Sequence, residues 1–212
     1  GLSSFFDRSR KGEMSLLVVT AAIYFFYFHH VILNVNSVMT SITFDTIKNY
    51  YTFVYHIVHD DSMLHFGGMQ YPFGDHVVYT DCQPALTFLL RPFTFLHPYA
   101  VGILHSLFFV SFVSTPAVIR RVLLNLDVKP PLAWCGALGL GILSPQFLKM
   151  NAGHFALCYT VMIPLAMLMV IRLVRKPLAV PAIALFVYNS LVFWIHPYMG
   201  VGLSLFSLFC LL

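Results

Sequence analysis

Residues 14–33, "MSLLVVTAAIYFFYFHHVIL", form an apolar block without a single Asp, Glu, Lys or Arg. An α-helix needs about 20 such residues to cross a hydrocarbon core of ~30 Å, because each residue adds about 1.5 Å. The strands of a transmembrane barrel are instead segments of about 10 residues with alternating polarity. The block therefore predicts a membrane-spanning helix and an all-α fold.

The composition of the whole chain supports this interpretation. Of its 212 residues, 59% are hydrophobic and 9% are charged, whereas soluble domains carry roughly 25% charged residues. Comparable apolar blocks predict five further spans, at residues 98–119, 132–148, 154–171, 178–195 and 199–212. The sequence thus predicts an all-α, polytopic transmembrane helical bundle, in which Ala137 and Gly141 form a small-residue packing pair and Pro164 kinks a span.

The two end blocks carry expectations of their own. The last one, residues 199–212, is apolar up to the final residue and shorter than the roughly 20 residues of a full span. We therefore expect the chain to be the N-terminal part of a longer protein, truncated at 212. The first block lacks a small-residue cleavage signature, so we interpret it as a retained span rather than a signal peptide.

The basic residues predict an orientation. They are dispersed over short connections, which does not indicate nucleic-acid binding, and nine of the twelve fall on one side of the predicted bundle. By the positive-inside rule that side is cytoplasmic. Residues 1–13 are then a cytoplasmic N-terminus and residues 34–97 an extracytoplasmic loop. The nine are Arg8, Arg10, Lys11, Arg120, Arg121, Lys129, Arg172, Arg175 and Lys176.

Loops as long as residues 34–97 are usually functional or disordered, and the many apolar residues here disfavour disorder. Apolar residues recur at three- and four-residue spacing over residues 44–59, which predicts an amphipathic helix with Asn49 and His56 on its polar side. It lies either along the membrane interface or on the surface of the bundle. A second interfacial helix is expected at residues 82–95, with Asp81 as its N-cap and Pro84 in its first turn.

The most acidic part of this loop is residues 60–83, "DDSMLHFGGMQYPFGDHVVYTDCQ", which holds four of the eight acidic residues in the chain. Adjacent carboxylates can bind a divalent cation, or one can act as a base that its neighbour orients. Asp60 and Asp61 are therefore the candidate catalytic residues. The alternative is that one caps a helix and the other is solvated. The expected ligands of a divalent cation, Mg²⁺ or Mn²⁺, are Asp60, Asp61, His65 and Asp75.

A candidate anion site follows at residues 149–159, "KMNAGHFALCY". If Asn151 caps a span, His154 falls in the first helical turn, close to Lys149. Backbone N–H groups and cations at a helix N-terminus suit a lipid phosphate at this depth. The alternative is that Lys149 only extends towards water and His154 only satisfies a neighbour. Arg91 is the other cation of this side that could reach a phosphate.

The tripeptide His-Pro-Tyr occurs at residues 97–99 and again at residues 196–198. Proline suits a first helical turn and tyrosine suits the membrane interface, so both copies are explained as the beginnings of spans. His97 and His196 could also line a cavity at this side.

The layout resembles the GT-C superfamily of membrane glycosyltransferases. Two stretches are similar to segments of uncharacterised bacterial members: "QYPFGDHVVYTDCQP" at residues 70–84 and "GHFALCYTVMIPLAM" at residues 153–167. The resemblance implies sugar transfer from a polyprenyl-phosphate-linked donor to an acceptor on the extracytoplasmic face of the bacterial cytoplasmic membrane.

The resemblance also implies roles for particular residues. A first-loop aspartate, here Asp60 or Asp61, would serve as base or metal ligand. Cationic groups would hold the donor phosphate, here Arg91, Lys149 and His154. Many members carry an acidic residue directly after the first span, where this chain has Asn34 and Asn36 and the nearest carboxylate is Asp45.

Two other function classes fit the same sequence. One is a non-catalytic membrane assembly or binding subunit, whose acidic loop docks a protein partner or Ca²⁺. The other is a channel or transporter with carboxylates at its mouth. No Asp, Glu, Lys or Arg lies deep in a predicted span, which disfavours an ion-coupled transporter with a carboxylate at mid-membrane.

Overall fold

The computed structural model describes residues 10–212, so Arg8 and the rest of residues 1–9 lie outside the described part. The protein is mostly helical. Three segments are long and apolar enough to cross a membrane: α2 (Arg10–Leu33), Thr94–Asn125, and Pro130–Leu148. The second comprises η2 (Thr94–Tyr99) and α5 (Ala100–Asn125), and the third comprises α6 (Pro130–Ile142) and α7 (Pro145–Leu148). The prediction of helical secondary structure is confirmed, and the three segments support the prediction of a membrane protein by their length and composition.

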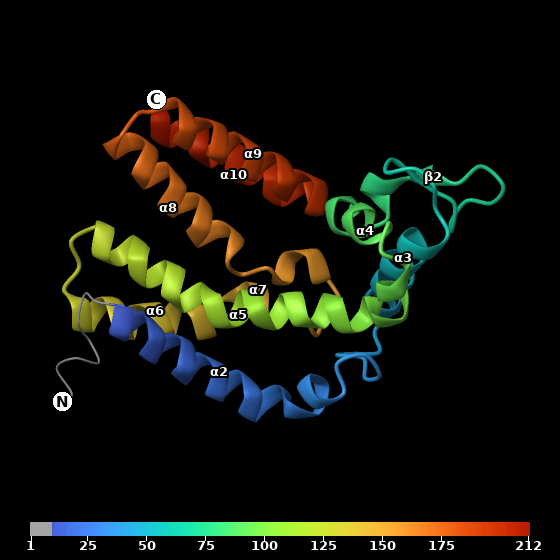
Figure 1. The fold of residues 1–212 in the computed structure, drawn as a ribbon, viewed down its shortest axis with the longest axis horizontal. Coiled ribbons are helices and arrows are strands. Elements are labelled where there is room, and N and C mark those ends of the chain that lie inside the picture. Colours follow the sequence, from blue (N-terminus) through green and yellow to red (C-terminus); the bar gives the residue numbers. More distant parts are fainter. Residues whose placement is uncertain (1–9) are drawn as a thin grey trace.

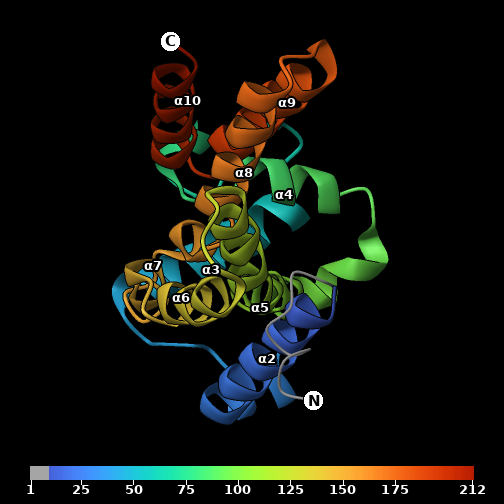
Figure 2. The same cartoon turned by 90° about the vertical axis from the view of Figure 1, so that its left-hand side faces the viewer.

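Three further helices complete the bundle: α8 (Met162–Arg175), α9 (Ala179–Ile195) and α10 (Pro197–Leu211). Figures 1 and 2 show α2, α5 and α6 on one side and α8, α9 and α10 on the other. Within the first group, α5 contacts α2 and α6, and it also contacts α8 of the second group. Helices α3 (Phe44–Val58) and α4 (Pro84–Leu90) cover one end of the bundle, called the α3 end below.

Aromatic side chains fill the core between α2, α5 and the α7 region. Phe108 and Phe112 of α5 are almost fully buried. The Phe112 ring lies 5.3 Å from that of Tyr24 and 5.2 Å from that of Phe147, and the Phe108 ring lies 5.3 Å from that of Phe155. Offset and edge contacts at these distances add to the burial of apolar area. This core fixes the loop that follows α7 against the middle of α5.

Small residues of α6 permit a close helix contact, as predicted for Ala137 and Gly141. Ala137 is fully buried. A Cβ atom added to Gly141 would lie 2.5 Å from Cγ of Pro116 in α5. The absence of a side chain at residue 141 is therefore what lets α6 approach α5.

The segment after α2 is tied to α5 and α3 by polar contacts. The imidazole of His105 donates from Nδ1 to the carbonyl oxygen of Val35 (2.6 Å), and its Nε2 is hydrogen-bonded to the Tyr50 hydroxyl. Asn36 donates to the Pro98 carbonyl (2.8 Å) and accepts from the Gly102 N–H (2.9 Å). Asn36 therefore links the segment after α2 to the start of α5.

Helix α3 has the predicted bounds to within a residue, but its buried face differs from the predicted one. Tyr50, Phe53 and Ile57 are buried, as are the polar residues Asn49 and His56. Ile47, Tyr51 and Val58, from the predicted apolar stripe, are 42–49% exposed. Helix α3 therefore packs on the bundle through a face that includes polar groups, which is the second of the two predicted placements.

The predicted helix at residues 82–95 is only partly present, and Asp81 is not its N-cap. Asp81 and Gln83 have positive φ angles of 57° and 58°, and Gln83 is the N-cap of α4. Pro84 therefore occupies the first helical position, where no backbone N–H is needed. Pro92 interrupts the helix, and η2 follows.

The predicted span at residues 154–171 begins later, at Met162. Residues 149–161 form turns and the short helix η3 (Phe155–Cys158), so Asn151 caps no span. A helix starting at residue 154 would place Pro164 in its interior, where the ring clashes with the preceding turn. Because α8 starts at Met162, Pro164 lies in its first turn. Pro164 therefore marks the beginning of a helix and does not produce the predicted kink.

The acidic loop forms a small hairpin. Strands β1 (His65–Phe66) and β2 (Asp75–His76) are antiparallel, with His65 opposite His76. A 3-10 turn, η1 (Val77–Tyr79), follows. Phe66, Val77 and Cys82 form a separate buried cluster beneath it. The hairpin extends beyond α3 and α4 at the α3 end (Figure 1).

Candidate functional site

A small polar cavity, with a volume of about 10 Å³, lies at the α3 end. It has room for about one water-sized group. Four separate segments contribute to its wall: α3, the turn before α4, the loop after α7, and the connection between α9 and α10. Its polar residues are Asn49, Asp81, His154 and His196, and Phe155 and Ala156 complete it.

Close backbone packing places His154 at the start of α3. Gly153 has a φ angle of +82°, and a Cβ atom there would lie 2.3 Å from the backbone nitrogen of Thr46. The Nδ2 group of Asn49 donates a hydrogen bond to the Gly153 carbonyl oxygen. A glycine is thus required at residue 153 both by its backbone conformation and by the contact.

Two carboxylates lie at this cavity or beside it. Asp81 accepts from Lys48 Nζ at 2.8 Å, and Asp45 Oδ2 lies 4.0 Å from His154 Nε2. The Asn49 side chain is 2% exposed, and its Oδ1 atom has no hydrogen-bond partner among the described residues. Because a buried acceptor without a donor costs free energy, the cavity suits a ligand that donates hydrogen bonds, such as a hydroxyl.

His196 contributes a neutral imidazole. Its Nδ1 accepts from the Met199 N–H at the start of α10 (3.4 Å), so we assign the ring proton to Nε2. Burial lowers the pKa of His196, and the nearby Asp81 carboxylate opposes this effect. At neutral pH the ring can therefore donate from Nε2 without adding a charge.

Asp60 and Asp61, the predicted catalytic pair, lie in different environments. Asp60 is 7% exposed, and its Oδ1 accepts from the Gly67 N–H at 2.8 Å. The Asp61 side chain is fully exposed and pairs with Arg91 at 3.2 Å. The structure thus separates a buried carboxylate that holds the hairpin from an exposed one that has a cation partner.

His56 lies next to Asp60 and is also buried. Its Nε2 donates to the Ser62 carbonyl (3.1 Å), and its Nδ1 is hydrogen-bonded to the Thr87 hydroxyl (2.6 Å). Burial lowers the pKa of His56, partly offset by Asp60. The neutral His56 ring therefore links the C-terminal half of α3 to Thr87 of α4.

The predicted phosphate ligands do not converge on one point. Lys149 and His154 lie in one turn, in which the His154 N–H donates to the Lys149 carbonyl (3.0 Å). Arg91 lies with Asp61 at the other end of α3. This helix has 15 residues, so the two ends are about 22 Å apart at ~1.5 Å per residue.

The predicted metal ligands are also dispersed. His65 Nε2 donates to the Phe73 carbonyl (3.0 Å), and Asp75 Oδ1 accepts from the His76 N–H (2.7 Å). Within residues 10–212, no group of three or more His, Cys, Asp or Glu side chains could hold a metal ion. Asp60, Asp61, His65 and Asp75 therefore form no such group in this part of the chain, and we derive no chemical step through a metal.

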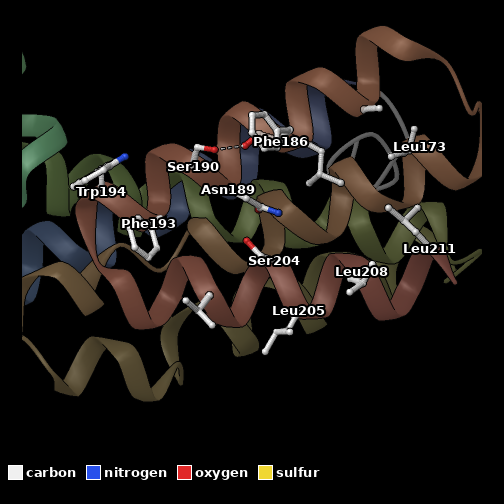
Figure 3. Close-up of a pocket in the computed structure, with 13 residues that line it drawn as sticks. Leu173, Phe186, Asn189, Ser190, Phe193, Trp194, Ser204, Leu205, Leu208 and Leu211 are labelled. Carbon is white, nitrogen blue, oxygen red and sulfur yellow. Dashed lines mark hydrogen bonds between the residues drawn. The ribbon is translucent and has the colours of Figure 1, made fainter. Parts of the chain in front are cut away.

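A larger groove, of about 610 Å³, runs between α9 and α10 (Figure 3). Its wall is mostly apolar and includes Phe186, Phe193 and Leu208. Asn189 projects into the space between the two helices, where its Nδ2 donates to Ser207 Oγ at 3.2 Å. The groove carries no titratable group, so the polar cavity is the better candidate for chemistry.

Sequence reasoning placed Asp81 at a helix cap and gave Asn49 no function. No spacing pattern in the sequence indicates that residues 49, 81, 154 and 196 meet. Two signals point to single members of the cavity. The candidate anion site includes His154, and the second His-Pro-Tyr tripeptide begins a helix and carries His196, which lines the cavity.

A family model described as a domain of unknown function (DUF6311) matches residues 17–212. Neither the curated proteins nor the solved structures contain a match to the chain.

Proposed function

The chain belongs to the DUF6311 family, and we propose that it is a polytopic membrane glycosyltransferase. In this proposal it transfers a sugar from a polyprenyl-phosphate-linked donor to an acceptor hydroxyl on the extracytoplasmic face of a bacterial cytoplasmic membrane. The N-terminus is cytoplasmic, and the α3 end, with the polar cavity, faces outward.

The observation that carries the proposal is the placement of Asp81. Its carboxylate lines a cavity with Asn49, His154 and His196 instead of capping a helix. The side chain is 35% exposed, so a substrate can reach it. Its backbone is held at a positive φ angle, a conformation that is rare outside glycine and that often occurs at functional sites.

The residues suggest a direct displacement. The Asp81 carboxylate takes the proton of the acceptor hydroxyl, whose oxygen attacks the anomeric carbon of the donor sugar. The bond between that carbon and the phosphate oxygen breaks, and polyprenyl phosphate leaves with the bonding electrons. Asn49 Oδ1 and His196 Nε2–H can orient the acceptor. Lys48 fixes the position of the base through its 2.8 Å ion pair.

The leaving phosphate requires nearby cations. Lys149 is exposed and lies in the same turn as His154, beside the cavity. A positive charge here would stabilise the negative charge that develops on the phosphate. Arg91 lies about one α3 length away, so we place it outside this group.

An Asp81→Asn substitution tests the proposal. It preserves side-chain shape but removes the base, and loss of a general base typically lowers a rate by about 10²–10⁴-fold. Membranes containing each variant would be incubated with radiolabelled polyprenyl-phosphate hexoses, and release of polyprenyl phosphate would be measured. Asp75→Asn is the matched control, because Asp75 lies in the same loop but outside the cavity. Release that is unchanged in Asp81→Asn would contradict the assignment of the base.

The Lys48–Asp81 ion pair favours a second candidate, a non-catalytic assembly or binding subunit. A carboxylate that already has a cation partner can simply stabilise the contact between α3 and the turn before α4. In that case the wild-type protein would release no polyprenyl phosphate. A protein partner would instead copurify with it and be lost from Asp81→Asn.

A further inference from the structure

The tip of the β1–β2 hairpin displays two aromatic rings. Tyr71 is 93% exposed and Phe73 is 85% exposed. Single exposed apolar residues are common, but two such rings separated by one proline on a projecting loop are unusual. In Figure 1 the loop extends past α3 and α4, on the side away from the long apolar helices.

The hairpin is held firmly to α3. The Gly67 N–H donates to Asp60, and the Tyr51 hydroxyl donates to the Gly68 carbonyl (3.0 Å). Phe66 is fully buried, and its ring lies 5.2 Å from that of Tyr55. The base of the hairpin is thus fixed by α3 and by Asp60.

The tip itself is also ordered by hydrogen bonds. The Phe73 N–H donates to the Gln70 carbonyl (2.9 Å), and His65 Nε2 donates to the Phe73 carbonyl (3.0 Å). Gly74, with a φ angle of +70°, has no room for a Cβ atom, which would lie 2.3 Å from His65 Nε2. Rings presented on such a preorganised loop lose little conformational entropy when they bind a ligand.

We propose that this aromatic tip, Gln70 to Phe73, binds an uncharged carbohydrate chain. The faces of Tyr71 and Phe73 pack on the apolar C–H faces of sugar rings. The Tyr71 hydroxyl and the Gln70 amide hydrogen-bond to sugar hydroxyls. The choice of a sugar rests on the proposed function, in which an acceptor glycan approaches from this side.

The size of the tip favours a sugar over a protein partner. An aromatic side chain can bury roughly 150–250 Å², so two rings offer about 300–500 Å². A stable protein interface needs about 800 Å² on each partner. The loop that carries the rings extends past α3 and α4, beyond the end of the long apolar helices (Figure 1). This position disfavours insertion into the membrane.

The charge of the tip points to a neutral ligand. Residues 62–74 contain no Asp, Glu, Lys or Arg. An anionic headgroup or an acidic glycan would find no cation in this segment. An uncharged oligosaccharide, with apolar faces and hydroxyl edges, matches both the rings and the neutral polar groups.

The experiment measures the binding of oligosaccharides in the absence of any polyprenyl-phosphate sugar donor. The full chain in detergent would be applied to an immobilised panel of neutral gluco-, galacto-, manno- and N-acetylglucosamine oligosaccharides. Binding would be compared with that of a Tyr71→Ala/Phe73→Ala double variant. Phe95→Ala is the matched control, because Phe95 is 69% exposed but belongs to η2. We expect the wild type and Phe95→Ala to bind at least one oligosaccharide and the double variant to bind it at least about tenfold more weakly.

The inference is overturned if the wild type binds no oligosaccharide of the panel. It is equally overturned if the double variant binds as well as the wild type. The result of this binding experiment can be distinguished from the result of the sugar-transfer experiment. Glycan binding without detectable transfer would leave the tip assignment standing, whereas transfer without tip-dependent binding would remove only this inference.

Discussion

At the level of single residues, Asp60 shows how burial changes the role of a carboxylate. One oxygen accepts from the Gly67 N–H, and the other, Oδ2, has no hydrogen-bond partner among the described residues. A buried charge is costly unless it is paired. Asp60 is therefore better placed to stabilise the hairpin than to meet a substrate, since it lies at the opposite end of α3 from the polar cavity.

The effect of an Asp60 substitution on stability is expected to depend on whether the new side chain still accepts the hydrogen bond from the Gly67 N–H. Asp60→Ala leaves the Gly67 N–H without an acceptor and should destabilise the protein by about 1–3 kcal/mol. Asp60→Asn keeps an acceptor oxygen and should stay within about 1 kcal/mol of the wild type. Thermal unfolding in detergent and hydrogen exchange of the Gly67 amide would measure both. A folded Asp60→Asn protein that has lost sugar transfer would instead support the catalytic role predicted from the sequence.

The residues of the polar cavity could be found in the sequence only in part. His154 was singled out because it lies close to Lys149, and the structure keeps the two residues in one turn. Asp81 was assigned to a cap, because propensity does not reveal the positive φ angles of residues 81 and 83. Asn49 depends on a contact with Gly153, which is distant in sequence. Long-range contacts of this kind are invisible to local patterns.

At the level of elements, apolar periodicity predicted that α3 exists and where it begins and ends. It did not identify the buried face, because the Nδ2 group of Asn49 and both ring nitrogens of His56 find partners on neighbouring segments. These contacts allow polar side chains to lie on the buried face of α3. The start of α8 was missed for a different reason. The apolar run begins before Met162, and only the constraint at Pro164 fixes the helix start.

Two glycines of α6 give a matched test of helix packing. A Cβ atom at Gly139 would meet nothing within 4 Å, whereas at Gly141 it would lie 2.5 Å from Pro116 Cγ. Gly139→Ala should therefore stabilise the protein by about 0.5–1 kcal/mol, the usual gain for a helix interior. Gly141→Ala should destabilise it by about 1–3 kcal/mol through overpacking.

Thermal unfolding of both variants in the same detergent would check this expectation. The two substitutions add the same methyl group to the same helix, so any difference between them reports the contact with α5. Equal shifts in the unfolding temperature would mean that α6 does not approach α5 as closely as the structure shows.

At the level of the whole molecule, composition and the length of the apolar blocks together predict a helical membrane protein. Three segments have the length and apolarity of spans. The number of crossings is a harder question, because α8, with 14 residues, covers only about 21 Å at ~1.5 Å per residue. The proposed topology requires the segment from α6 to α8 to cross the membrane twice, with the loop at residues 149–161 on the outer side.

Cysteine labelling tests this topology directly. In a variant whose four native cysteines are replaced, single cysteines would be introduced at Gln70, Lys129, Ala152 and Lys176, and intact cells would be treated with a membrane-impermeant maleimide. The positive-inside distribution of charge predicts labelling at residues 70 and 152 in intact cells, and at residues 129 and 176 only after permeabilisation. Labelling of residue 176 but not of residue 129 in intact cells would mean that the α6–α8 segment crosses only once. If residue 70 is protected in intact cells, the polar cavity and the aromatic tip lie in the cytoplasm. The protein could then neither bind an extracytoplasmic acceptor nor transfer a sugar to it, and both proposals would be wrong.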